Sequence, residues 1–357
     1  MRGEVVYLYA FDVANEIVTR DVRNILGLAT TVFEPRAAHT LPRDLPLYRA
    51  LTATLERDLT VNERRAVVRV RVYEVGVVAI SIAVAVDASS LSELASWHHP
   101  RLRDGGSLDA WTRDLCGEVC ASLGPALLRS SVPSQPEAYT VFCLAEVDAV
   151  DAAVWFDRER RAIAGLLAQA DPQALSEPQI DESLRIHRSY TRGDFVVVDW
   201  DASLVVEQDG YFDDVLYVLE LANLQLEEFR VMDERLDRHL ERAYRDLERA
   251  RGGMWRAPTA MLAWLRQFRI DVTKLADEVS HITKFFGDWY LARVYLGARE
   301  RFHLDPWRLS VDHRLQKLDE LYRMLHADVV ERRMLWLEVA VVVCFIVDLL
   351  ALFFWKR

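Results

Sequence analysis

Residues 66–86 read AVVRVRVYEVGVVAISIAVAV, and this stretch decides the fold of the first part of the chain. β-Branched residues dominate it on both sides of a short break at Glu74-Val75-Gly76. Such residues favour extended backbone, and a glycine between two apolar runs favours a turn. The stretch therefore predicts two adjacent strands, 66–72 and 77–86, that form a hairpin.

The flanking sequence predicts further elements around this hairpin, up to residue 206. Periodicity and turn residues place them at 5–11 (strand), 14–26 (helix), 108–123 (helix), 139–145 (strand) and 152–170 (helix). The order β-α-β-β-α-β is typical of a ferredoxin-like split βαβ unit. A second hairpin is predicted at 195–198 and 203–206, turning at Asp199-Trp200-Asp201. We therefore expect an α+β fold with a ferredoxin-like head over residues 1–206.

Residues 207–333 predict a helical stalk. One heptad core position is occupied by Phe212, Leu219, Leu226, Asp233, Leu240 and Leu247, and the other by Val215, Ala222, Phe229, Leu236, Ala243 and Ala250. This repeat is typical of long coiled-coil helices. The single polar break, Asp233, either specifies register or oligomer state or faces solvent, and the sequence leaves both interpretations open.

Two further helices are predicted after this one. Gly252-Gly253 ends the first helix, and Pro258 lies near the start of a second that can run to about residue 297, so the two could form an antiparallel hairpin. Asp305-Pro306 is a typical start for a third helix. Because nothing breaks the pattern between 309 and 355, we expect one continuous helix there.

The last part of this third helix, residues 334–355, is strongly apolar. It reads MLWLEVAVVVCFIVDLLALFFW, 22 residues that would extend about 33 Å as a helix, close to the ~30 Å core of a bilayer. Glu338 and Asp348 are its only ionisable carboxylates. The run predicts a transmembrane helix over 334–355, and its position predicts a tail-anchored protein of the inner or cytoplasmic membrane with the head in the cytoplasm.

The two acids of this run are candidate contact residues. An aspartate at the depth of Asp348 costs roughly 2.5–3.5 kcal/mol on insertion scales, so we favour a role facing a partner helix over a tolerated protonated acid. Glu338 is closer to the end of the run and is expected at the interface. Together with Asp233, these residues form the predicted set of membrane or oligomer contacts.

The net charge and the motifs of the sequence limit the classes of function that we expect. A net charge of −11 argues against a nucleic-acid-binding body. The sequence contains no phosphate loop, dinucleotide fingerprint or nucleophile elbow, so we expect no enzyme and no cofactor. Three cysteines lie outside the apolar run, Cys116, Cys120 and Cys143, and they fit a reducing compartment.

Three groups of residues could bind metal, and a structural interpretation is favoured for each. Cys116 and Cys120 share a helical face but lack further ligands, which favours core cysteines. The pair His98-His99 is typical of a surface loop. The acids of the third group suit a solvated turn and a helix start better than a cation site; they are Asp199, Asp201, Glu207, Asp209, Asp213 and Asp214. We therefore assign no metal site.

Residues 288–350 also resemble a known family. Asp288-Trp289-Tyr290-Leu291 and Tyr295-Leu296 precede Asp312-His313-Arg314-Leu315, and Trp336-Leu337-Glu338 is followed at a ten-residue spacing by Asp348. With the strands around 69–78, this pattern resembles the required-for-meiotic-nuclear-division (RMD, sporulation-type) family, as a distant bacterial-like member. Family members typically carry Leu-Asn where this chain has Asp312-His313. The resemblance implies a membrane-anchored, non-enzymatic α+β and coiled-coil protein, with the ribosome as a possible partner.

These observations predict a tail-anchored, homo-oligomeric scaffold or adaptor that recruits a cytosolic protein to a membrane. The alternative is a single-span oligomeric channel or transporter-like protein with a cytosolic regulatory head. A third possibility is an enzyme or ligand-binding site on the head, which would require a pocket with convergent polar groups.

Overall fold

The computed structural model describes residues 1–33, 36, 50–131, 135–149, 151–251, 266–273 and 289–355. The chain divides into two compact units, which are described separately. Unit 1 combines Met1–Val231 with Glu278–Trp307, of which 289–307 are described, and unit 2 combines Met232–Asp277 with Arg308–Arg357. Two long helices therefore contribute to both units. The predicted domain boundaries at 206 and 333 stay predictions.

The predicted hairpin lies within the main sheet of unit 1. Its strands are β8 (Arg64–Tyr73) and β9 (Val77–Asp87), and they pair antiparallel as the sequence predicted. Strand β1 (Arg2–Asp12) pairs with the other edge of β9, with Tyr9 opposite Ile80. Side chains on both faces of β9 are buried from Val77 to Val84, which explains its nearly continuous apolar sequence.

Ten strands form this sheet. Its order is β12-β13-β14-β11-β1-β9-β8-β6-β5, and β7 pairs separately with β8. The remaining strands of the sheet are β5 (Thr31–Val32), β6 (Ala50–Leu55), β7 (Thr60–Val61), β11 (Glu137–Glu146), β12 (His187–Arg188), β13 (Asp194–Val198) and β14 (Ala202–Glu207). Strands β11 and β14 are parallel, and the other pairs are antiparallel. The second predicted hairpin is thus confirmed as β13 and β14.

Helices cover one face of the sheet and enclose the larger core. They are α1 (Leu91–Leu94), α2 (Leu108–Leu123), α3 (Ala152–Leu167) and α4 (Glu177–Ser183). The predicted helix at 108–123 is confirmed at both ends because the Ser107 side chain caps its first turn and Gly124 follows its last. Alternate side chains of β1, including Tyr7 and Phe11, pack into this core with α2 and α3.

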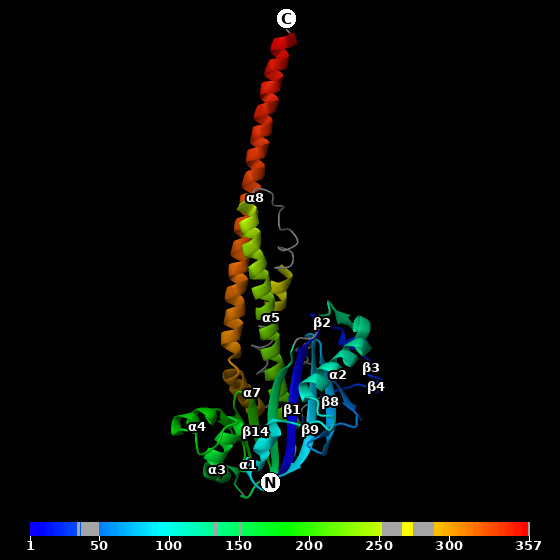
Figure 1. Cartoon of the computed structure of the whole chain (residues 1–357), viewed down its shortest axis with the longest axis vertical. Coiled ribbons are helices and arrows are strands. Elements are labelled where there is room, and N and C mark those ends of the chain that lie inside the picture. The colour runs from blue at the N-terminus through cyan, green and yellow to red at the C-terminus, as the bar shows by residue number, and fades with distance from the viewer. Residues whose placement is uncertain are drawn as a thin grey trace. The chain divides into compact units, whose positions relative to one another are not determined.

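Two other helices cover the opposite face. They are the first part of α5 (Asp213–Arg251) and α7 (Trp289–Arg301). Glu220 of α5 accepts hydrogen bonds from Arg71 and Tyr73 on β8, and α7 contacts β12 and β13. Unit 1 is therefore a three-layer arrangement in which the sheet lies between two sets of helices (Figure 1).

The ferredoxin-like head was a wrong prediction, because the structure is a mixed α/β fold with one large sheet. The segment predicted as a helix at 14–26 forms β2 (Glu16–Ile17), a 3-10 turn and β3 (Asn24–Ile25), and Ile17 pairs with Leu127. β-Branched residues there disfavour a helix. Without that helix no crossover follows β1, which instead runs antiparallel to both of its neighbours, β9 and β11.

Two short strand pairs lie outside the large sheet. β10 (Leu127–Leu128) pairs with β2, and β3 pairs with β4 (Leu28–Ala29). They follow β1 and α2 in the chain. The turn at Leu26-Gly27 between β3 and β4 has positive φ at both residues, as tight hairpins require.

Unit 2 contains long helices. In it, the end of α5 and the first part of α8 (Leu304–Trp355) beyond Trp307 lie side by side and run in the same direction (Figure 1). Helix α8 is continuous over 52 residues, which confirms the single helix predicted from 309 to 355. A further helical segment is described at 266–273. The antiparallel hairpin predicted from Pro258 onward lies largely outside the described residues.

The transmembrane prediction was wrong. Among the residues that the structure describes, no helix is both long enough and apolar enough to cross a membrane. Two carboxylates, Glu338 and Asp348, interrupt the apolar run of α8. The expected tail-anchored topology and inner-membrane localisation are corrected accordingly.

Candidate functional site

The end of α8 carries the largest exposed apolar surface among the described residues. Eleven large apolar side chains are between 51% and 75% exposed: Met334, Leu335, Trp336, Leu337, Val339, Val341, Val342, Val343, Phe345, Ile346 and Val347. This part of α8 extends past the described end of α5 (Figure 1). Contiguous apolar patches of more than a few hundred Å² are rare on monomers and mark interaction sites. We call residues 334–347 the apolar segment.

Asp233 lies in unit 2 and not in this segment. Its carboxylate is 3.1 Å from Nε of Arg314 on α8 and accepts a hydrogen bond from Ser310 at 3.4 Å. Partial burial raises the pKa of Asp233, and Arg314 opposes that shift. Arg314 also pairs with Asp237. The polar residue in the heptad core therefore joins α5 to α8 within one chain.

Glu338 and Asp348 are exposed on α8. Because Glu338 lies 24 residues after Arg314, it is roughly 36 Å further along the helix than the ion pair of Asp233. The structure thus does not bring the three predicted contact residues together. Whether any of them contacts another molecule stays a prediction.

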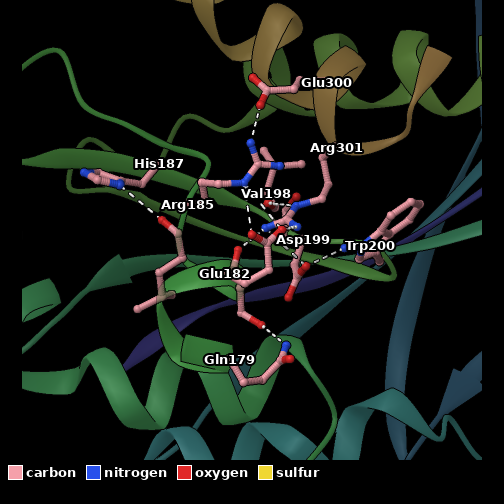
Figure 2. Close-up of polar contacts among 12 residues, drawn as sticks. Gln179, Glu182, Arg185, His187, Val198, Asp199, Trp200, Glu300 and Arg301 are labelled. Carbon is pink, nitrogen blue, oxygen red and sulfur yellow. Dashed lines mark hydrogen bonds and ion pairs between the residues drawn. The ribbon is translucent and has the colours of Figure 1, made fainter. Parts of the chain in front are cut away.

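Arg301 forms a buried polar network that sequence reasoning missed. Its guanidinium lies between α4 and the β13–β14 turn (Figure 2), where Nε donates to the Val198 carbonyl at 3.2 Å and Nη1 to Glu182 at 2.8 Å. Asp199 lies 3.5 Å from Nη2. Burial raises the pKa of Asp199, and Arg301 partly offsets this effect. The network attaches α7 to α4 and to the β13–β14 turn.

A second arginine extends this network at the surface. Arg185 pairs with both Glu182 and Glu300, and it joins α7 to the segment after α4 (Figure 2). Desolvation opposes ionisation of Glu182, but Arg185 and Arg301 outweigh it and lower the pKa of this carboxyl. Every acceptor around Arg301 thus comes from the protein itself. The arrangement stabilises the fold and leaves no vacant position for a substrate anion at this guanidinium.

The acids between 199 and 214 do not form a cation site. Asp199 belongs to the Arg301 network, Asp213 pairs with Arg69 at 3.0 Å, and Asp214 accepts hydrogen bonds from Tyr211 and from the Arg36 backbone. Burial, with Asp194 and Asp209 nearby, raises the pKa of Glu207 to about 7. Within the part of the chain that the structure describes, no three His, Cys, Asp or Glu side chains gather closely enough to hold a metal ion.

His98 and His99 line a cavity of about 1020 Å³ next to α3. His98 Nε2 is 2.7 Å from the Leu166 carbonyl, and its ring packs edge-on against Phe142. Burial lowers the pKa of His98. The two arginines of this cavity, Arg158 and Arg161, already pair with protein carboxylates and carbonyls. The described lining therefore shows no set of convergent free groups that would carry a reaction.

The cysteines of α2 behave as core residues. Cys116 is fully buried and Cys120 is half-buried, and both are free thiols. A hydrogen bond with Cys120 and burial raise the pKa of Cys116, while the same hydrogen bond lowers the pKa of Cys120. A buried, protonated thiol is a poor nucleophile and a poor metal ligand. The interpretation as core cysteines fits this arrangement.

The fold and this surface define a two-unit protein with a ten-stranded mixed sheet and a long helix that ends in an exposed apolar segment. Residues 2–213 match the family described as "Uncharacterized protein MJ0711, N-terminal domain", which is more than half of the chain. The chain belongs to this family.

Among individual proteins, the chain is similar to the uncharacterized protein MJ0711 of Methanocaldococcus jannaschii. The two are 23% identical over 214 residues, which is 60% of this chain, and the chain spans 65% of that relative's length. No solved structure matches the chain.

The resemblance to the meiotic-nuclear-division family was wrong, because the chain belongs to a different family. The specific motifs that suggested it lie in residues 288–350, outside the matched region, and only the strands around 69–78 lie inside it. Aromatic, leucine and acidic residues at such spacings occur in many amphipathic helices, so they were weak markers. The expectation that the ribosome is a partner loses that support.

Proposed function

We propose that this protein is a non-enzymatic scaffold that assembles through the apolar segment of α8 and recruits a protein partner through unit 1. The observation that carries the proposal is the exposure of eleven large apolar side chains in residues 334–347. Burying such surface is the main driving force of protein association. A helix that is apolar on all sides is typically buried and not left exposed to water.

The chemistry of unit 1 supports a scaffold over an enzyme. Its buried charges, Arg71 with Glu220 and Arg301 with Glu182 and Asp199, satisfy one another. The cavity beside His98 is lined by arginines that already pair with protein groups. The single-span channel required the same membrane span as the tail anchor and is not proposed.

The proposal is tested by comparing the full chain with a chain that ends at Arg333. Side chains of α8 that are buried in unit 2, such as Val311, Leu318 and Tyr322, all precede the truncation, so the shorter chain keeps its packing. For the full chain, we expect light scattering to give a molar mass greater than that of one chain, because it associates with other copies or with another protein. For the truncated chain, we expect the molar mass of a single chain. Single-chain masses for both would overturn the proposal.

A further inference from the structure

One heptad pattern runs through α8 from residue 311 to residue 353. Its core positions are Val311, Leu315, Leu318, Tyr322, Leu325, Val329, Arg332, Trp336, Val339, Val343, Ile346, Leu350 and Phe353. The spacing alternates strictly between four and three residues, which is the signature of a helix that packs along one seam. Arg332 is the single polar residue in this row. It separates the seam into two parts.

The first part of the seam is already covered inside unit 2. Val311, Leu315, Leu318 and Tyr322 are each at most 5% exposed. In the second part, Trp336, Val339, Val343 and Ile346 are between 51% and 75% exposed. The same row of side chains thus changes from packed to uncovered along one helix. A continuous repeat of this kind predicts a partner helix for the second part as well.

The two acids of the segment lie away from this seam. When Trp336 and Val343 occupy heptad position a, and Val339 and Ile346 position d, Glu338 falls at position c and Asp348 at position f. Positions c and f face solvent in a coiled coil. Like charges on neighbouring copies would therefore not meet at the core. This placement differs from the earlier expectation that Asp348 faces a partner helix.

We propose that the occupant of the seam is the same segment of other copies of this chain, in a parallel bundle of three or four helices. This inference rests on the proposed scaffold function. β-Branched residues at both core positions, here Val343 at a and Ile346 at d, favour three or four strands over two. Leu335 and Val342 at position g and Val347 at position e widen the apolar face, as larger bundles require.

Cyclic symmetry explains the parallel direction. Closed assemblies of identical chains are most often related by a rotation axis, and a three-fold or four-fold axis along the bundle makes the helices parallel. Each layer then contains the same residue from every copy, such as Ile346 beside Ile346. Neighbouring helices bury the flanking e and g residues between them.

The exposed area is sufficient for this assembly. At roughly 100 Å² for each apolar side chain, the seven exposed side chains at positions a, d, e and g give every copy on the order of 700 Å² of apolar surface at the seam. A helix in a bundle turns more than half of its circumference toward its neighbours. Three such copies together bury on the order of 2,000 Å² in the bundle, which exceeds the ~1,000 Å² in total that a biological interface needs.

Site-specific cross-linking tests the arrangement. In a Cys344→Ser background of the full chain, Ile346→Cys places a thiol at core position d, and Val341→Cys places one at outer position f. A short bismaleimide should link Ile346→Cys chains to each other in high yield and Val341→Cys chains at least several-fold less. Val339→Cys is a second core variant, and Cys344→Ser alone reports any linking through Cys116, Cys120 or Cys143.

The outcomes separate this inference from the scaffold function. Strong linking at 346 and 339 with weak linking at 341 supports the parallel bundle. Equal or absent linking at all three positions in an assembled protein contradicts it. If the complex contains a single copy of this chain with a different protein bound to α8, the inference fails while the scaffold function stands. If neither kind of association occurs, both fail.

Discussion

Glu220 accepts hydrogen bonds from two buried side chains of β8. It accepts from Arg71 Nη1 at 2.8 Å and from the Tyr73 hydroxyl at 2.5 Å, and the side chains of Arg71 and Glu220 are 4% and 3% exposed. The Arg71 guanidinium also lies over the Phe33 ring. Burial alone would lower the pKa of Arg71, but Glu220 and Tyr73 outweigh it and raise the pKa. The guanidinium therefore stays charged inside the protein.

Replacing Glu220 should destabilise unit 1 strongly. Glu220→Ala leaves the Arg71 charge buried without its partner, and we expect the free energy of unfolding to fall by about 3–5 kcal/mol. Urea denaturation followed by circular dichroism measures this. Glu146→Ala is the matched control, because its pair with Arg2 is 3.4 Å long and well exposed, so it should change stability by less than about 1 kcal/mol.

A double variant separates the charge from the packing. Arg71→Met with Glu220→Leu removes both charges and keeps apolar volume, so it should recover the loss seen with Glu220→Ala except for about 1–3 kcal/mol, because the buried Tyr73 hydroxyl still lacks its acceptor. Equal losses in the single and double variants would show that packing, and not the unpaired charge, causes the effect. The sequence could not predict this pair, because 149 residues separate its members.

Arg301 acts at the scale of an element, since its contacts attach the end of α7 to the sheet. Arg301→Leu would leave the Val198 carbonyl and Asp199 without this donor in a buried place, and a buried unsatisfied group costs about 1–3 kcal/mol. We expect faster amide hydrogen exchange in residues 289–301 and little change in α2. Arg160→Gln is the control, because that side chain is 42% exposed and pairs with Asp181 of α4 and not with α7, so it should have a small effect. Unchanged exchange in α7 would contradict the assigned role.

Most individual elements could be predicted from sequence, and their assembly could not. Helix α2 and the two hairpins follow local patterns of capping, periodicity and turn residues. The segment 14–26 failed because its apolar spacing suits a helix while Ile17 pairs with the distant Leu127. The order of strands in a sheet depends on pairs of strands that are far apart in the sequence, such as β1 and β11. A ferredoxin-like order was therefore inferred from element sequence alone and was wrong.

At the scale of the whole molecule, the apolar run at the end of α8 was recognised and then misassigned. Hydropathy finds such a run but does not say what covers it, and lipid and a helical partner place similar demands on its composition. The sequence shows the apolar stripe that begins with Val311 and Leu318, and the burial of these side chains shows that the stripe packs against other parts of unit 2 and fixes the heptad phase. Trp336 and Ile346 follow from that phase and not from hydropathy.

Sedimentation equilibrium of two matched variants shows whether the apolar segment assembles copies of this chain. The variant Val339→Glu/Ile346→Glu places charges on the seam, and Val341→Glu places one at an outer position. We predict three or four chain masses for the unmodified chain and for Val341→Glu, and one chain mass for Val339→Glu/Ile346→Glu. One chain mass for the unmodified chain, or unchanged assembly of the seam variant, would contradict the account.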